Sequence, residues 1–200
     1  MYESCIKRLL DLILSLAACV VLAIPMGIIA LWIKKDSPGP VFFKQRRVGR
    51  GKKCFNILKF RTMRGDTPHD VPTHLLKNAD SYITKSGAFL RRTSLDELPQ
   101  IYNILKGDMS IVGPRPERPE LAAELEKEIP EFSFRLQVKA GLTGYAQVYG
   151  KYNTTPYDKL KLDLTYIRNY SVLEDLKLII MTPKIMLMKE STEGVKEEQK

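Results

Sequence analysis

The chain is poor in the residues from which many catalytic centres are built. Its 200 residues include only two histidines and three cysteines. His69 and His74 lie in one polar stretch, and no two cysteines have the spacing of a metal or redox motif. The sequence therefore argues against a zinc site built on histidine and against a Ser-His-Asp triad. We interpret Cys5, Cys19 and Cys54 as reduced thiols of a protein that faces the cytosol.

Internal repeats and biased tracts are also lacking. The composition is that of a folded protein, with 44% hydrophobic and 28% charged residues. The length allows one domain of ordinary size with its own core. The net charge of +9 suits nucleic acid, anionic lipid or an anionic small substrate. The apolar segment described next favours the lipid and the small substrate.

One apolar run is long enough to enter a bilayer. Within the 22 residues from Leu12 to Ile33, only Ser15 is strongly polar, and this length suits a membrane helix. No small-x-small cleavage site follows, which argues against a signal peptide. Pro25 lies in the middle of the run, where it would remove a backbone hydrogen bond and kink a helix.

Basic residues flank the apolar run on both sides. Lys7 and Arg8 precede it, while Lys34 and Lys35 follow it. Since lysine and arginine favour the cytoplasmic side, this symmetry suits a helix that dips into one leaflet and returns. A transmembrane helix with a proline kink is the alternative that these residues leave open. Asp11 is expected to pair with Arg8 or Lys7, or to lie at the membrane interface.

The remaining pattern predicts an α+β fold that is mainly helical, with short strands. After a turn at 36–40, we expect strands at 41–43 and 54–63 around a basic hairpin, which either is a solvated loop or contacts lipid phosphates. A polar loop should follow at 64–82. A helix at 176–189, broken at Pro183, should lie on a membrane surface, with a pair of core helices as the alternative. Further helices are expected at 87–92, 98–106, 119–129 and 157–169, and further short strands at 109–112 and 142–150.

The most informative stretch is 93–100, which contains the adjacent acids Asp96 and Glu97. Arg91 and Arg92 precede these acids. Carboxylates beside clustered cations suit a site that handles Mg²⁺ and phosphate. At the start of a helix, backbone N–H groups also favour phosphate.

A purely structural interpretation of the same stretch remains open. Ser94 followed three residues later by Glu97 matches a capping box, in which neither acid takes part in chemistry. Pro99 weakens this interpretation, because with Ser94 as the cap it would lie beyond the first turn. Two other features favour the phosphate site: Arg115 lies in the stiff turn Gly113–Pro116, and Lys139 precedes the glycine-bracketed turn at 141–144.

Four motifs occur in one order along the chain: Lys59–Met63, Thr93–Gln100, Gly107–Pro116 and Gly141–Val148. Together they resemble the bacterial sugar transferase family of monotopic phosphoglycosyl transferases, from about Lys7 to Met188. The chain looks like the minimal catalytic unit of that family. The resemblance implies transfer of a phosphosugar from a UDP-sugar to polyprenyl (undecaprenyl) phosphate, with release of UMP and with Mg²⁺ required.

The resemblance also implies roles for individual residues. Asp96 would be the nucleophile that forms a covalent phosphosugar intermediate. Glu97 would help to hold Mg²⁺, with Asp96 as the second ligand, or would act in proton transfer. Arg91 and Arg115 would clamp phosphates. Other residues implied to contact substrate or phosphate are Lys59, Arg61, Pro114, Lys139, Gln147 and Asp163.

The resemblance further implies a re-entrant anchor at 1–35 with both ends cytoplasmic, a membrane-associated catalytic domain at 36–189 and a disordered charged tail at 190–200. The expected partners are the two substrates, membrane lipids and a second copy of the chain, but not nucleic acid. The expected location is the cytoplasmic face of the bacterial inner membrane. One departure is Lys139-Ala140, where family members often have a basic residue followed by proline. A membrane-anchored basic adaptor that binds anionic lipid or nucleic acid without chemistry is the competing hypothesis.

Overall fold

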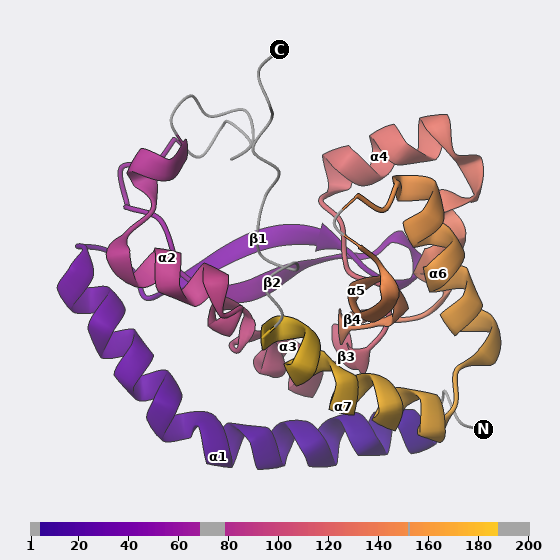
Figure 1. Cartoon of the computed structure of the whole chain (residues 1–200), viewed down its shortest axis with the longest axis horizontal. Helices are drawn as coiled ribbons and strands as arrows, with labels where there is room; N and C mark the ends of the chain where they lie inside the picture. The colour runs from indigo at the N-terminus through magenta and orange to yellow at the C-terminus, as the bar shows by residue number, and fades with distance from the viewer. Residues whose placement is uncertain (1–4, 69–78, 152, 188–200) are drawn as a thin grey trace.

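The computed structural model describes residues 5–68, 79–151 and 153–187. The predicted tail at 190–200, both histidines and most of the predicted polar loop therefore lie outside the described residues. The described part is mainly helical with four short strands, as predicted (Figure 1). The elements are α1 (Lys7–Asp36), β1 (Phe42–Val48), the 3-10 helix η2 (Arg50–Lys52), β2 (Cys54–Phe60), η4 (Ala79–Tyr82), α2 (Lys85–Arg92), η5 (Leu95–Glu97), α3 (Gln100–Lys106), β3 (Met109–Val112), α4 (Pro119–Glu128), η6 (Pro130–Gln137), β4 (Ala140–Thr143), α5 (Tyr145–Tyr149), α6 (Pro156–Asn169) and α7 (Val172–Leu187).

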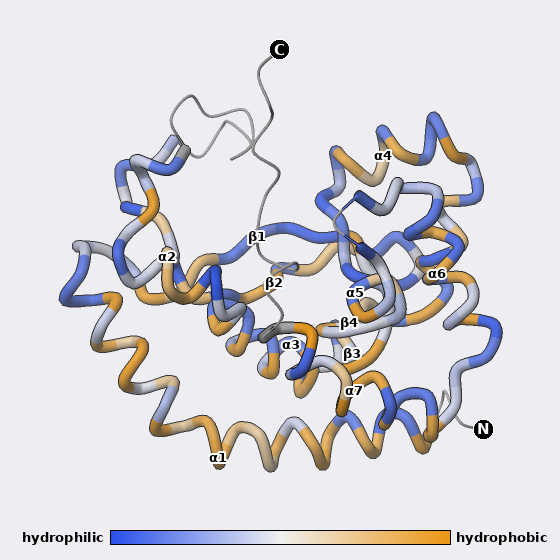
Figure 2. Tube along the Cα trace, in the orientation of Figure 1, coloured by the Kyte–Doolittle hydropathy of each residue, from blue (hydrophilic) through white to orange (hydrophobic). Residues whose placement is uncertain are grey.

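Helix α1 is the apolar segment and forms one edge of the molecule. It is 30 residues long, contains Pro25 and bends along its length (Figure 1). It is the one helix among the described residues that is long and apolar enough to cross a membrane, and little of it is buried. Its colour is mostly that of hydrophobic residues in Figure 2. Five large side chains along it are 63–76% exposed: Val20, Val21, Ile24, Ile28 and Leu31.

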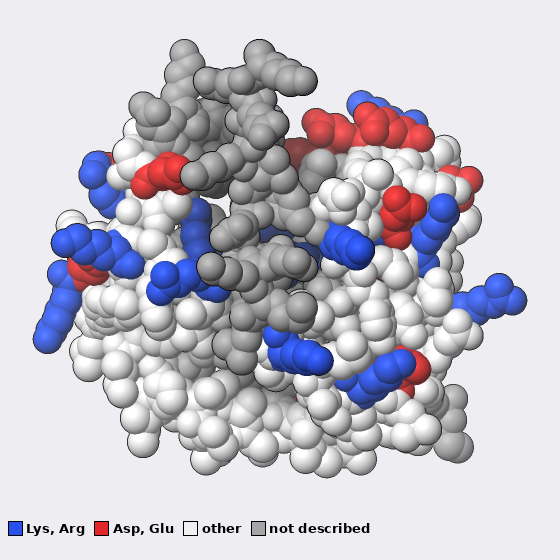
Figure 3. Space-filling model, viewed as in Figure 1, with Lys and Arg blue, Asp and Glu red and all other residues white. Residues whose placement is uncertain are grey.

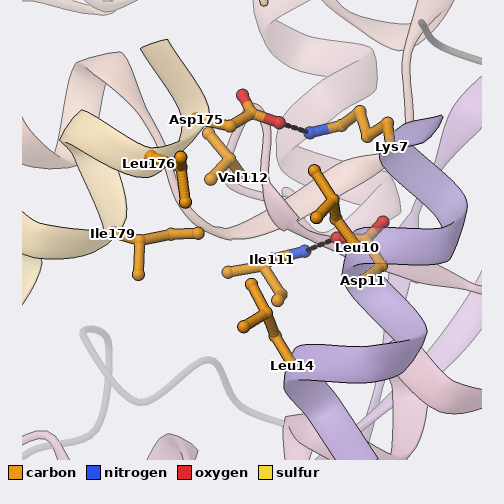
Figure 4. A pocket seen from close by; sticks show the side chains of 9 residues that line it. All are labelled: Lys7, Leu10, Asp11, Leu14, Ile111, Val112, Asp175, Leu176 and Ile179. Carbon is orange, nitrogen blue, oxygen red and sulfur yellow. Dashed lines mark hydrogen bonds and ion pairs between the residues drawn. The ribbon is translucent and has the colours of Figure 1, made fainter. Parts of the chain in front are cut away.

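The first turns of α1 carry a buried polar stripe. Lys7, Asp11 and Ser15, four residues apart, lie on one helical face and are each less than 10% exposed. Figure 4 shows Lys7 facing Asp175 of α7 and Asp11 facing the backbone of Ile111, beside a small cavity between α1, β3 and α7.

Asp11 does not use the partners that the sequence suggested. Its Oδ1 accepts hydrogen bonds from Ser110 Oγ at 3.0 Å and from the Ile111 backbone N–H at 2.9 Å. The expectation of a pair with Arg8 or Lys7 is therefore wrong, because β3 offers a donor pair at the same depth. Arg8 instead donates to the carbonyls of Ile104 (2.6 Å) and Leu105 (2.8 Å) near the end of α3, where a cation is favoured.

The other end of α1 is attached to the same folded domain. Asp36 accepts from the Ser86 N–H at 2.7 Å, close to the start of α2. The guanidinium of Arg61 donates to the carbonyls of Ser37 (2.7 Å) and Pro38 (2.5 Å). A buried cluster of Ile29, Ile33, Phe60 and Leu90 joins this half of α1 to β2 and α2.

The strands form two small sheets. β1 and β2 make the predicted hairpin, in antiparallel register from Phe42 with Phe60 to Val48 with Cys54. β3 and β4 pair in parallel, with Ser110 opposite Gly141. A second cluster, Ile57, Ile104, Met109 and Ala140, packs α3 between the sheets, and a third, Val112, Val148, Tyr166 and Leu178, joins β3 to α5, α6 and α7.

Several predicted elements differ from the structure. The strand predicted at 41–43 continues to Val48 as β1, because its residues pair with β2 along the whole length. The strand predicted at 142–150 ends at Thr143, and α5 replaces the rest, because Val148 must face the cluster around Tyr166. The predicted break at Pro183 is wrong, since α7 continues through it. Pro183 removes one backbone hydrogen bond from α7, and the packing of this helix against β3 and β4 offsets the loss.

Candidate functional site

The acid pair lies in a short 3-10 helix between α2 and α3. Ser94, which precedes it, adopts a left-handed conformation with φ of 54°, which is uncommon for residues other than glycine. Its side chain makes no capping bond, and α3 begins only at Gln100. The capping-box interpretation is therefore wrong, and the carboxylates of Asp96 and Glu97 are free to point elsewhere.

Glu97 is held by two cations from different parts of the chain. Arg115 binds it in a bidentate manner, with Nη1 3.1 Å from Oε2 and Nη2 2.5 Å from Oε1. Lys59 of β2 donates to Oε1 at 2.7 Å. Burial alone would raise the pKa of Glu97, but Arg115 and Lys59 together hold it far below its ordinary value. These two cations thus favour the ionised form of Glu97.

Asp96 lies beside this pair with a looser attachment. Its Oδ2 is 3.8 Å from Lys59 Nζ, and its side chain is 13% exposed. Burial raises the pKa of Asp96 above its usual range; Lys59 opposes this shift and the charge of Glu97 adds to it. Two adjacent carboxylates therefore have pKa values pushed in opposite directions, which is a common feature of sites where two acids have different roles.

The two predicted arginines that precede this site in the chain have different surroundings. Arg91 of α2 donates from Nε to Thr62 Oγ1 at 2.9 Å, and its charge acts on Asp96. Burial lowers the pKa of Arg91, and Asp96 opposes that change. Arg61, in contrast, is buried with its guanidinium on the carbonyls of Ser37 and Pro38. Its predicted contact with phosphate stays a prediction.

The turn that carries Arg115 is held at every residue from 113 to 117. Gly113 N–H donates to the Thr143 carbonyl at 2.8 Å, and the Pro114 carbonyl accepts from Gly141 N–H at 2.9 Å. A Cβ built on Gly141 would lie 2.1 Å from Gly113 N, so only glycine allows this approach. Two segments that carry the family resemblance, Gly113–Pro116 and Gly141–Val148, thus contact each other directly in the structure.

Three groups from outside the turn donate hydrogen bonds to its backbone carbonyls. Arg135 Nη2 of η6 donates to the Arg115 carbonyl at 2.9 Å, and Arg47 Nη1 of β1 donates to the Pro116 carbonyl at 3.1 Å. The Val48 N–H donates to the Glu117 carbonyl at 2.9 Å. Sequence reasoning missed Arg135 and Arg47, because neither belongs to a local motif and both lie far from Arg115 in the chain.

The remaining predicted residues do not reach the acid pair directly. Lys139 Nζ and Arg8 Nη2 lie 3.7 and 3.5 Å from the position that a Cβ on Gly107 would occupy, at the far end of α3. Asp163 is 1% exposed and pairs with Arg135, with Nη2 2.7 Å from Oδ2. The side-chain amide of Gln147 is buried and has no hydrogen-bond partner among the described residues. Their predicted roles in binding substrate stay predictions.

The carboxylates available for a metal ion are few. Among the described residues no three His, Cys, Asp or Glu side chains come together. Mg²⁺ commonly needs only one or two protein carboxylates, because water and substrate phosphates complete its shell. Asp96 fits this requirement, because among the described residues the one cation within 4 Å of its carboxylate is Lys59, at 3.8 Å. Glu97 beside it would share the ion with Arg115 and Lys59, which already donate to its oxygens. The face in Figure 3 carries many Lys and Arg side chains, its largest group of acidic side chains lies over α4, and its lower edge along α1 is uncharged.

Comparison with known proteins places this geometry in context. The model of a family described as bacterial sugar transferase matches residues 2–189. The chain is 45% identical over 181 residues to a UDP-glucose:undecaprenyl-phosphate glucose-1-phosphate transferase of Xanthomonas campestris pv. campestris, covering 88% of this chain and 37% of the relative. It is 37% identical over 186 residues to a UDP-N-acetylgalactosamine-undecaprenyl-phosphate N-acetylgalactosaminephosphotransferase of Aeromonas hydrophila, covering 91% and 44%.

A shorter relative matches along almost its whole length. It is the exopolysaccharide production protein PSS of Rhizobium leguminosarum bv. phaseoli, with 42% identity over 187 residues, 88% of this chain and 92% of the relative. The chain thus spans less than half the length of the Xanthomonas and Aeromonas proteins and nearly all of the Rhizobium protein.

Proposed function

Since this chain belongs to the bacterial sugar transferase family, we propose that it transfers a sugar phosphate from a UDP-sugar to undecaprenyl phosphate. The observation that carries the proposal is the pairing of Asp96 with Glu97. One carboxylate is loosely attached and has a raised pKa, while its neighbour is held ionised by Arg115 and Lys59. That arrangement suits a nucleophile beside a charge-binding group.

The proposed reaction has two displacements at one phosphorus atom. A carboxylate oxygen of Asp96 attacks the sugar-bearing phosphorus of the donor. The bond from this phosphorus to the bridging oxygen breaks, and UMP leaves with that oxygen. A phosphate oxygen of the undecaprenyl acceptor then attacks the phosphosugar on Asp96, which releases the carboxylate and forms an undecaprenyl diphosphosugar. Splitting one displacement into two is the usual benefit of covalent catalysis.

The cations around the acid pair have defined roles in this proposal. Arg115 is half exposed, so it can bind donor phosphate while its fork still holds Glu97. Arg91 and Lys59 contribute positive charge close to Asp96. Asp96 and Glu97 would hold Mg²⁺, which when bound offsets negative charge on the diphosphate. Because Glu97 is held strongly ionised, it is a poor proton acceptor, so we assign it to charge binding rather than to proton transfer.

We also propose that α1 is a re-entrant anchor. A straight helix of its length would extend about 45 Å, more than the bilayer core. Yet Lys7 and Arg8 at one end and Asp36 at the other bond to the same domain. A helix that crossed the bilayer would have to separate one of these ends from its partners. The attachment of both ends, together with exposed apolar side chains between them, therefore favours a helix that enters and leaves on the cytoplasmic face.

The proposal is tested by UMP release from a panel of UDP-sugars, with undecaprenyl phosphate and Mg²⁺, for the wild-type protein and for Asp96→Asn. We expect release by the wild type alone, from one or two sugars, and loss of release when EDTA is added. A matched control is Glu124→Gln, which neutralises an exposed acid of α4, away from the acid pair. Equal release by the wild type and Asp96→Asn would remove Asp96 from the nucleophile's role. No release from any donor would favour the basic adaptor.

A further inference from the structure

Arg135 is a buried guanidinium with an unusual set of partners. Its side chain is 5% exposed and stacks on Phe132, with 4.8 Å from the guanidinium carbon to the ring centre. One nitrogen, Nη2, lies 2.9 Å from the Arg115 carbonyl and 2.7 Å from Asp163 Oδ2. Its other terminal nitrogen lies 3.5 Å from Glu117 Oε1. Arg135 thus joins α6 to the backbone of the residue whose side chain binds Glu97.

Burial of the Asp163 carboxylate is energetically unfavourable. It is 1% exposed, and neither carboxylate oxygen has a well-oriented hydrogen bond among the described residues, so the ion pair with Arg135 is its main compensation. Buried ion pairs with few additional hydrogen bonds contribute little to stability, and apolar residues of similar volume often replace them without loss. The pair therefore calls for an explanation other than stability.

The contacts of Arg115, whose carbonyl Arg135 binds, supply that explanation. The Arg115 carbonyl and the Arg115 guanidinium belong to one residue in a turn whose neighbours are fixed by Gly141 and Thr143. Fixing the carbonyl sets the direction in which the guanidinium leaves the backbone. The guanidinium must meet Glu97 with two parallel contacts, a geometry that tolerates little misplacement.

We propose that the buried pair Arg135–Asp163 positions Arg115 against Glu97 for the transfer reaction, so that Arg135 and Asp163 are positioning residues rather than substrate contacts. The inference rests on the proposed function for its consequence in catalysis. It also gives Asp163 a role that needs no contact with substrate, in agreement with its burial. Arg47, which binds the next carbonyl from β1, is a second support of the same turn.

The test replaces the pair by apolar residues of similar size, in the double variant Arg135→Met with Asp163→Leu. The matched control is Arg168→Met, which removes an exposed arginine from α6. Three properties are measured: the thermal midpoint, the rate of UMP release, and the side-chain ¹⁵N–¹H signals of Arg115 in protein labelled at arginine, assigned with Arg115→Lys.

We expect the double variant to keep a thermal midpoint close to that of the wild type while UMP release falls about 10- to 100-fold. The Arg115 signals should shift and broaden, since the guanidinium is no longer fixed, and the control should match the wild type in all three properties. A double variant with unchanged Arg115 signals would overturn the inference.

Two further outcomes are informative. If the wild type itself shows no transfer, the proposed function fails, but the Arg115 signals still decide the inference. If the double variant does not fold, Arg135→Lys replaces it, because a lysine retains the charge but has one terminal nitrogen in place of two, so it cannot contact Glu117, Asp163 and the Arg115 carbonyl together. Wild-type turnover and wild-type Arg115 signals in Arg135→Lys would contradict the positioning role, whereas loss of both would support it.

Discussion

Lys7 and Asp175 form a buried ion pair between the first and the last described helices, across 168 positions of the sequence. Tyr166 completes the group: its hydroxyl accepts from Lys7 Nζ at 3.0 Å and donates to Asp175 Oδ1 at 2.7 Å. The start of an apolar helix is therefore part of the folded domain and not merely a flank of a membrane segment. This relationship underlies the proposal that both ends of α1 lie on one side of the bilayer.

The first prediction concerns the stability of that contact. Lys7→Met removes the cation that pairs with the buried Asp175 carboxylate. We expect a loss of roughly 3–5 kcal/mol in the free energy of unfolding. The measurement is denaturant or thermal unfolding in detergent, with Lys34→Met as control, since Lys34 is exposed at the other end of α1.

A second variant separates the lost pair from lost packing. Lys7→Met combined with Asp175→Leu removes both charges and should recover most of the lost stability. If Lys7→Met were as stable as Lys34→Met, the attachment of the first turn of α1 would not be a structural contact in solution.

The second prediction concerns topology. Cys5 and Cys54 are both exposed, one before α1 and one at the start of β2. In a re-entrant arrangement both thiols face the cytoplasm. In a Cys19→Ala background, a membrane-impermeant maleimide should therefore label neither thiol in intact cells and both after permeabilisation. Labelling of Cys5 in intact cells, with Cys54 protected, would show instead that α1 crosses the bilayer.

Much of this architecture could be predicted from the sequence, because it follows from local patterns. The hairpin, α3 with its stop at Gly107 and the helices α4 and α6 each have a periodicity or a capping residue of their own. Gly107 ends α3 with a positive φ, as a C-terminal glycine should. The motifs that carry the family resemblance also meet in space around Glu97 and Arg115.

What the sequence could not predict depends on contacts between distant segments. Arg135 and Arg47 are ordinary basic residues in the chain and become specific only through the carbonyls that they bind. In the sequence, Lys7 and Asp11 look like charges that flank a membrane segment. Only the structure shows that their partners are provided by α7 and β3. The α5 helix was missed because its tyrosines and valine favour a strand locally, while packing against Tyr166 decides the outcome.

The third prediction concerns the bidentate contact of Arg115 with Glu97. Arg115→Lys keeps the charge but loses the bidentate contact, so we expect UMP release to fall about 10- to 100-fold. The charge of Arg115 also lowers the pKa of Asp96, which burial has raised, so displacing that charge raises the pKa of the Asp96 carboxyl further. The acid limb of the pH–rate profile should therefore move to higher pH. Arg168→Lys on α6 is the control, and a profile identical to that of the wild type would argue against the pairing.

The fourth prediction is a pH dependence of stability. Burial raises the pKa of Asp163 to about 6 in spite of Arg135 on η6; Glu117, in the turn before α4, adds to the rise and Lys159 on α6 opposes it. Between the ordinary pKa and this value the folded protein binds more protons at Asp163 than the unfolded chain does. Stability contributed by this group is therefore present at low pH and is lost as pH rises toward 6.

Asp163→Asn removes this dependence. The stability of the wild type relative to Asp163→Asn should fall by roughly 2–3 kcal/mol between pH 4 and pH 7. Denaturant unfolding of both proteins at a series of pH values measures the difference. Two stability curves that remain parallel over this range would show that Asp163 titrates at its ordinary pKa.

The proposed reaction requires that Asp96 becomes covalently attached to the sugar phosphate. The most direct measurement is peptide mass spectrometry of the protein after incubation with its UDP-sugar and Mg²⁺ in the absence of undecaprenyl phosphate. We predict an adduct of one sugar phosphate on Asp96 in the wild type, its loss when the acceptor is added, and none in Asp96→Asn. Active wild-type protein that carries no adduct, or carries it on another residue, would show that Asp96 is not the nucleophile.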